Sequence, residues 1–145
     1  MDRRSLCLTV PLVALGGCVG PPRDGDGGEP PHVTDATLRD TGRCSDPETA
    51  TVDVSESEIR VTGCVTGPNG CAVAALGTAT VEEDRLDVVV TTERDAPPDV
   101  GCTQALVYRG YVGTVTVDGG RPATVRVVHD APGARRTVTE RPVDS

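Results

Sequence analysis

Apolar and polar residues alternate with a period of two from about residue 33 towards the C-terminus. The alternation runs over segments 51–54, 59–66, 73–81, 86–92, 103–117, 123–129 and 137–140. A period of two is the pattern of strands that bury one face, and Val and Thr, which favour strands, dominate these segments. No segment keeps the 3.6-residue period of an amphipathic helix over three turns. The pattern therefore predicts an all-β domain.

Short turns separate the predicted strands. Residues 67–70 read Gly-Pro-Asn-Gly, a strong turn sequence, and further breaks occur at 55–57, 82–84, 96–99, 118–120 and 131–133. The longest predicted strand, 103–117, carries Arg109 on an otherwise apolar face, and we expect a bulge or bend near Gly110. Six to eight short strands with regular turns predict a single antiparallel β-sandwich, immunoglobulin-like, with a small barrel as the alternative.

The region before these strands has two parts of different composition. Residues 6–15 form an apolar run of about ten residues after two arginines. As a helix this run covers about 15 Å, against the roughly 30 Å that a membrane-spanning helix must cross, so it predicts a signal peptide. Residues 19–31 are rich in Gly, Pro and Asp and predict a flexible tether, whose rms reach is about 20 Å. Residues 24–29 superficially resemble a calcium-binding loop, but they lack the third ligand before the glycine and the terminal Glu at the spacing that such a loop requires.

Residues 15–18, Leu-Gly-Gly-Cys, resemble the lipobox of lipoprotein precursors. In that family the cysteine thiol is alkylated by lipid and the peptide bond before it is cut. The resemblance implies a signal peptide over 1–17, a lipid on Cys18, a tether over 18–32, a β-domain over 33–141 and a tail over 142–145. The protein would be exported and anchored to the outer face of the cell membrane. Arg3 and Arg4 also resemble a twin-arginine export signal, and both this and the general pathway stay open.

Cysteine usage fits an exported domain. If, as the lipobox resemblance implies, Cys7 leaves with the signal peptide and Cys18 takes the lipid, four of the six cysteines remain: Cys44, Cys64, Cys71 and Cys102. An even number predicts disulfides, and of three connectivities we favour Cys44 with Cys64 and Cys71 with Cys102. Zinc is the competing hypothesis, but the spacings lack the close pairs typical of structural zinc sites.

The composition is acidic and poor in aromatic residues. The formal net charge is -8, and Lys, Trp and Phe are all absent, so arginine is the only basic residue apart from histidine. This composition resembles that of salt-adapted proteins from extreme halophiles, although a GC-rich genome would produce a similar bias. A surface of this charge repels phosphate, and the two tyrosines offer no stacking platform, so nucleic acid is excluded as a partner. Together with the lipobox, the composition resembles the small acidic surface lipoproteins of halophilic archaea, whose function is unassigned.

Candidate chemistry is sparse. Tyr108, Arg109 and Tyr111 would form a small recognition patch, the alternative being core packing with an arginine whose charged end reaches water. His129 and Asp130 would form a proton-transfer pair, the alternative being a half-buried histidine at a strand end. The sequence does not supply the set of residues that a blue-copper site or a serine triad requires. We therefore expect no catalytic set, no metal and no cofactor.

Two functional classes remain. The first, which we favour, is a monomeric, non-catalytic binding or structural envelope module, held to the membrane through Cys18 and binding an envelope protein or polymer. The alternative is a carboxylate-dependent extracytoplasmic hydrolase acting on envelope polymer. A pocket where two carboxylates converge, or where His129 meets a partner, would favour the enzyme.

Overall fold

The computed structural model describes residues 30–131 and 134–143. The predicted signal peptide, the lipid on Cys18 and most of the predicted tether lie outside the described residues. The described strands are β3 (His32–Arg43), β4 (Thr49–Val54), β5 (Glu58–Gly67), β6 (Ala72–Glu82), β7 (Arg85–Arg94), β8 (Val107–Asp118), β9 (Thr124–Ala131) and β10 (Ala134–Pro142). The all-β prediction is confirmed, and no described element is a helix long and apolar enough to cross a membrane.

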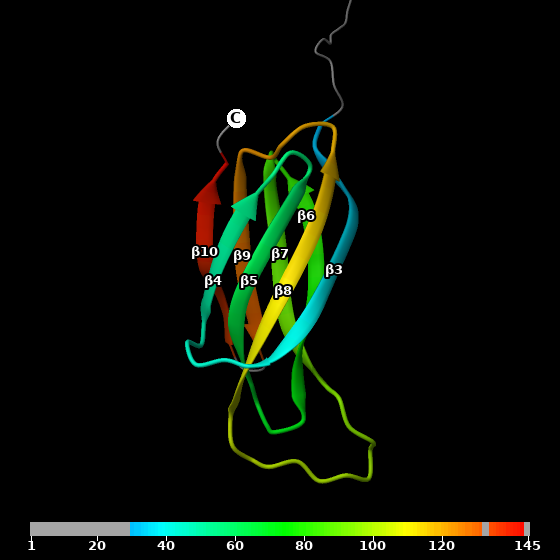
Figure 1. Cartoon of the computed structure of the whole chain (residues 1–145), viewed down its shortest axis with the longest axis vertical. Coiled ribbons are helices and arrows are strands. Elements are labelled where there is room, and N and C mark those ends of the chain that lie inside the picture. The colour runs from blue at the N-terminus through cyan, green and yellow to red at the C-terminus, as the bar shows by residue number, and fades with distance from the viewer. Residues whose placement is uncertain (1–29, 132–133, 144–145) are drawn as a thin grey trace, which may run out of the picture.

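The strands form two four-stranded sheets that pack face to face (Figure 1). One sheet has the order β10-β9-β7-β6 and the other β3-β8-β5-β4. The expectation of a wholly antiparallel sandwich is wrong at one place, because β7 and β9 pair in parallel. Between them the chain crosses to the other sheet as β8 and then returns. A parallel pair requires such a long crossover, which the local pattern of the strands does not reveal.

Side chains join the two sheets along both edges. At one edge the backbone N–H of Ala74 in β6 donates to Oδ2 of Asp40 in β3 at 2.8 Å. At the other edge the guanidinium of Arg141 in β10 donates to the backbone carbonyl of Val52 in β4. The backbone ladders end at these edges, so the fold is two linked sheets, and the barrel alternative does not apply.

The core between the sheets consists mainly of valine. Burial of one such side chain stabilises a fold by about 1.5–3 kcal/mol, so many small residues replace the missing large aromatics. The buried cluster comprises Val52, Ile59, Val61, Val65, Ala74, Leu86, Val88, Val90, Tyr111, Val115, Val117, Val125 and Val127.

Both favoured disulfides are present. Cys44 pairs with Cys64, and Cys71 pairs with Cys102. In the chain-entropy model each closure adds about 3 to 4 kcal/mol of stability. Disulfides persist in oxidising compartments, so the two bonds indicate an extracytoplasmic environment.

The two ends of the sandwich differ. β3 starts at one end, where His32 pairs with Asp118. The connections 68–71 and 95–106, which the second disulfide joins, lie at the opposite end (Figure 1). We call this opposite end the distal end, and the rest of the description concerns it.

Candidate functional site

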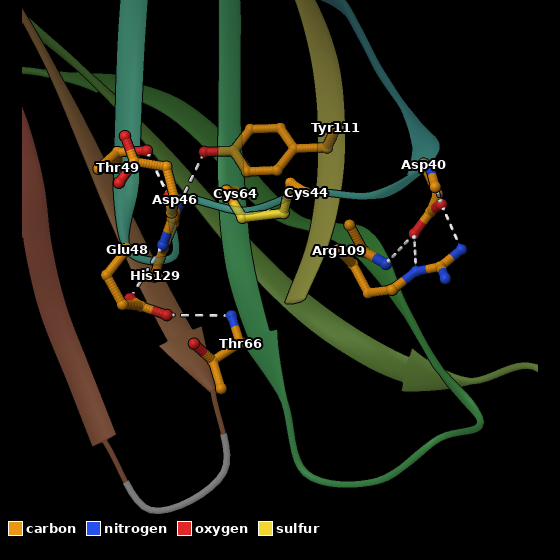
Figure 2. Close-up of a disulfide and its surroundings, with 12 residues drawn as sticks. Asp40, Cys44, Asp46, Glu48, Thr49, Cys64, Thr66, Arg109, Tyr111 and His129 are labelled. Atoms are coloured by element: carbon orange, nitrogen blue, oxygen red, sulfur yellow. Dashed lines mark hydrogen bonds and ion pairs between the residues drawn. A yellow bond between two sulfur atoms is a disulfide. The ribbon is translucent and has the colours of Figure 1, made fainter. Parts of the chain in front are cut away.

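Three polar side chains form a hydrogen-bonded chain between the sheets (Figure 2). Tyr111 comes from β8, His129 from β9 and Glu48 from the segment before β4. The hydroxyl of Tyr111 lies 2.7 Å from Nε2 of His129, and Nδ1 of His129 lies 3.0 Å from Oε1 of Glu48. Tyr111 and His129 are enclosed, at 0% and 1% exposure, whereas the Glu48 side chain is 22% exposed. The chain of bonds thus runs from the interior to the surface.

The chemistry of the three groups assigns their protons. An ionised carboxylate only accepts hydrogen bonds, so Nδ1 of His129 carries the hydrogen and donates to Glu48. Nε2 is then the acceptor, and the Tyr111 hydroxyl donates to it. In this arrangement the buried imidazole is neutral and both its nitrogens are satisfied.

Burial sets the direction of the pKa shifts. Burial lowers the pKa of His129 more than the neighbouring Glu48 carboxylate raises it. Burial and the charge of Glu48 both raise the pKa of Tyr111. For Glu48, partial burial disfavours the charged form, but hydrogen bonds from Thr66 and His129 outweigh it and leave the pKa below its ordinary value. A neutral His129 and an ionised Glu48 are therefore the stable forms near neutral pH.

The backbone around Glu48 aims its carboxylate inward. Glu48 has a φ of 61°, in the left-handed region that non-glycine residues rarely occupy, and its N–H donates to the carbonyl of Cys64 at 2.7 Å. Its Oε2 accepts the backbone N–H of Thr66 at 3.0 Å (Figure 2). The Cys44–Cys64 disulfide holds the segment before Glu48 against β5. Local strain is thus offset by contacts that bring Glu48 to His129.

Tyr111 fits because β5 carries a glycine beside it. A Cβ atom at Gly63 would lie 2.5 Å from the Tyr111 hydroxyl oxygen and 2.6 Å from the carbonyl of Thr49. Real carbon atoms do not approach oxygen this closely, so a side chain at position 63 would displace the phenol.

A cavity of about 300 Å³ opens at the distal end beside Glu48. Its lining is mainly apolar, with Glu48 as the one carboxylate among the described residues that line it; the set is Glu48, Thr66, Gly67, Pro68, Leu106, Ala131, Ala134 and Arg136. This is near the lower size limit of small-molecule sites. The enclosed His129 and Tyr111 hold Glu48 in place. Of these three hydrogen-bonded residues, Glu48 is the one that lines the cavity.

His129 and Asp130 are not a proton-transfer pair. His129 lies within β9 and is fully buried, so it is not the half-buried strand-end residue that the sequence suggested. Asp130 instead forms an ion pair with Arg135 at 3.0 Å. Glu48, the actual partner of His129, was missed because no pattern links residues 81 positions apart. Its position in a loop next to Cys44 carried no recognisable motif.

The three residues of the predicted recognition patch have different environments. Tyr111 is buried and hydrogen-bonded to His129, whereas Tyr108 is 41% exposed. Arg109 binds Asp40 through two hydrogen bonds, at 2.7 and 3.0 Å (Figure 2). Asp40 also accepts the N–H groups of Gly42 and Ala74, and thus joins β3, β8 and β6. Arg109 is therefore part of the framework, and Tyr108 alone of the three is available at the surface.

The expected irregularity near Gly110 lies on the neighbouring strand. Asp40 pairs with Tyr111 and Gly42 pairs with Gly110, so Thr41 is the extra residue of a bulge in β3. Gly42 has a φ of 102°, which glycine adopts without strain. The bulge turns Asp40 towards Arg109 and Ala74.

Large apolar side chains are exposed at the distal end. In the described parts of the chain they are Val100, Leu106 and Tyr108, at 45%, 64% and 41% exposure. We call these three residues the distal apolar residues. A second cavity, of about 280 Å³, is lined by Leu106 and Tyr108 together with Arg43. Leu106 thus borders two hollows.

No metal centre is formed by the described side chains: no group of three or more His, Cys, Asp or Glu residues is placed to hold an ion. The features available for function are therefore the cavity beside Glu48 and the distal apolar residues. No relative offers a further guide, because the chain matches no protein-family model, no curated protein and no solved structure.

Proposed function

We propose that this protein is an exported surface lipoprotein that binds an envelope protein or polymer through its distal end. The lipid on Cys18 and the tether to residue 32 anchor it to the outer face of the membrane, as its resemblance to acidic lipoproteins of halophilic archaea implies. The β-domain, which we take to be immunoglobulin-like, is the binding module. Its two disulfides and facing sheets support this role.

The observation that carries the proposal is the position of the distal apolar residues. Val100 and Leu106 belong to the connection 95–106 and Tyr108 to the start of β8, at the end of the domain opposite the start of β3 (Figure 1). The predicted tether ends at residue 32, where β3 starts. An exposed apolar group costs free energy in water unless a partner covers it. A domain held at its other end presents this group outwards, away from the point of attachment.

Capture from the native envelope at native salt tests the binding role. The wild-type protein is compared with the double variant Leu106→Ser/Tyr108→Ser and with Glu56→Ser, a control in the exposed connection at the opposite end. We expect the double variant to lose the partners that the wild type and the control retain. Identical partner sets for all three proteins would contradict binding through the distal end.

Anchoring is tested separately. A Cys18→Ser variant expressed in the source organism is expected to leave the membrane fraction, because the thiol that accepts the lipid is gone. Continued membrane association of this variant after a high-salt wash would contradict lipid attachment at Cys18.

The hydrolase alternative rests on one observation, that Glu48 faces a cavity and is hydrogen-bonded to His129. In that case Glu48 would act as a general base on a segment of the envelope polymer held against Leu106 and Pro68. Glu48→Gln would then abolish hydrolysis of envelope polymer by the purified protein. Equal activity of the variant and the wild type would reject this alternative.

A further inference from the structure

An arginine side chain lies against one sulfur of the distal disulfide. Nη1 of Arg94, the last residue of β7, is 2.8 Å from Sγ of Cys102. Nη2 of the same guanidinium donates to the carbonyl of Pro97 at 2.9 Å and to the carbonyl of Val100. The cation is thus held within the 95–102 connection, next to Cys102.

This contact makes the two sulfurs of the bond inequivalent. A neighbouring cation stabilises a thiolate, and the thiol with the lower pKa is the better leaving group in thiol–disulfide exchange. Cys102 has such a cation. Cys71 instead has the side-chain oxygen of Asn69 near its backbone, bonded to its N–H at 2.9 Å, and no described cation bonds its sulfur.

The other disulfide lacks this arrangement. Cys64 is 3% exposed, so a thiolate released there would be formed in the interior. Within 30–131 and 134–143, no arginine is hydrogen-bonded to the sulfur of Cys44 or Cys64. Burial without a cation raises the cost of a thiolate, and the Cys44–Cys64 bond should resist exchange.

We propose that the Cys71–Cys102 disulfide is a thiol-exchange site whose substrate is an extracytoplasmic thiol. The thiolate of the substrate attacks Sγ of Cys71 and forms a new S–S bond with it. The Cys71–Cys102 bond breaks, and its electron pair stays on Sγ of Cys102 as a thiolate beside Arg94. The product is a mixed disulfide on Cys71, which the Cys102 thiolate can reverse. The proposal does not depend on the binding role proposed above.

Exchange kinetics of the whole protein test this assignment. The protein is treated with excess 2-mercaptoethanol at fixed pH and salt, quenched with acid, alkylated and mapped by mass spectrometry. We expect Cys71–Cys102 to open before Cys44–Cys64 and the trapped adduct to lie on Cys71. Arg94→Gln should slow the opening of Cys71–Cys102 about three- to tenfold, and Arg94→Lys should slow it less. The rate for Cys44–Cys64 should not change, which makes it an internal control.

The opposite role of Arg94 predicts the opposite result. If Arg94 only braces the 95–102 connection, Arg94→Gln loosens that connection and the disulfide opens faster. An unchanged or faster rate would overturn the proposal. So would an adduct on Cys102 in the wild type, a measurement that needs no variant to fold. Repeating the assay with reduced thioredoxin, a protein dithiol, distinguishes a site open to protein thiols from one limited to small thiols. In whichever reaction occurs, the proposal requires that Arg94→Gln slow the opening of Cys71–Cys102.

Discussion

Glu48 and His129 are 81 residues apart in the chain, and their side chains meet at 3.0 Å between the two sheets. The pair is asymmetric, because the imidazole is enclosed and the carboxylate is partly exposed at the edge of a cavity. Since the Tyr111 hydroxyl satisfies the other imidazole nitrogen, the three groups form a complete polar network in a valine core. Such networks stabilise a fold when every member is bonded, and removal of one member leaves another unsatisfied.

Stability should fall in mild acid because of His129. Its pKa in the folded protein is below the ordinary value of 6.5, so the unfolded chain takes up the proton first as the pH falls. The contribution is therefore present above the ordinary value and is lost as the pH falls from that value through the lower pKa of the folded state. Protonation of Glu48 reduces the stability further at lower pH, since its pKa is below 4.5 in the folded state. Urea unfolding at several pH values measures this, and His129→Gln should flatten the slope between about pH 7 and 5.5; an unchanged slope would contradict the assignment.

Loss of the Tyr111 hydroxyl should destabilise the fold. Tyr111→Phe leaves Nε2 of His129 buried without a donor, which costs about 1–3 kcal/mol. Tyr108→Phe is the matched control, because its side chain is 41% exposed and the change should stay within about 0.5 kcal/mol. Chemical denaturation of both variants provides the comparison, and equal stabilities would argue against the hydrogen bond to His129.

The ion pair of Asp40 and Arg109 should show strong coupling. Both side chains are largely buried, and Asp40 links three strands, so Arg109→Ala should cost about 2 kcal/mol by leaving the carboxylate poorly compensated. A double-mutant cycle with Asp40→Ala should give a coupling free energy of about 1–2 kcal/mol. Additive effects of the two substitutions would show that the pair is not a unit.

A side chain at position 63 should displace Tyr111. Gly63→Ala places a carbon against the Tyr111 hydroxyl and the backbone of Thr49, and overpacking of this kind costs about 1–3 kcal/mol. Gly101→Ala is the control, since nothing lies within 4 Å of its Cβ position. Thermal unfolding should show a lower Tm for Gly63→Ala only. A Tm equal to that of the control would mean that β5 shifts to accept the methyl group.

Every described strand except β3, which none of the predicted segments covers, followed from local features of the sequence, as did the two disulfide pairings. The period-two pattern predicted β4 to β7 and β9 closely, and the turn at 67–70 separates β5 from β6 as expected. β8 begins at Val107 instead of 103, because residues 103–106 belong to the disulfide-linked distal connection. These features were accessible because alternation and turn chemistry are properties of neighbouring residues.

The sequence by itself determined that the chain is all-β, has a small valine core and carries four cysteines suited to disulfides. Only the tertiary structure decided that β7 and β9 run in parallel, that Glu48 binds His129, and that Arg94 lies on Cys102. The physical reason is the same in each case. Alternation reports which face of a strand is buried, whereas pairing and polar contacts depend on how distant segments assemble, and many assemblies satisfy one alternation pattern.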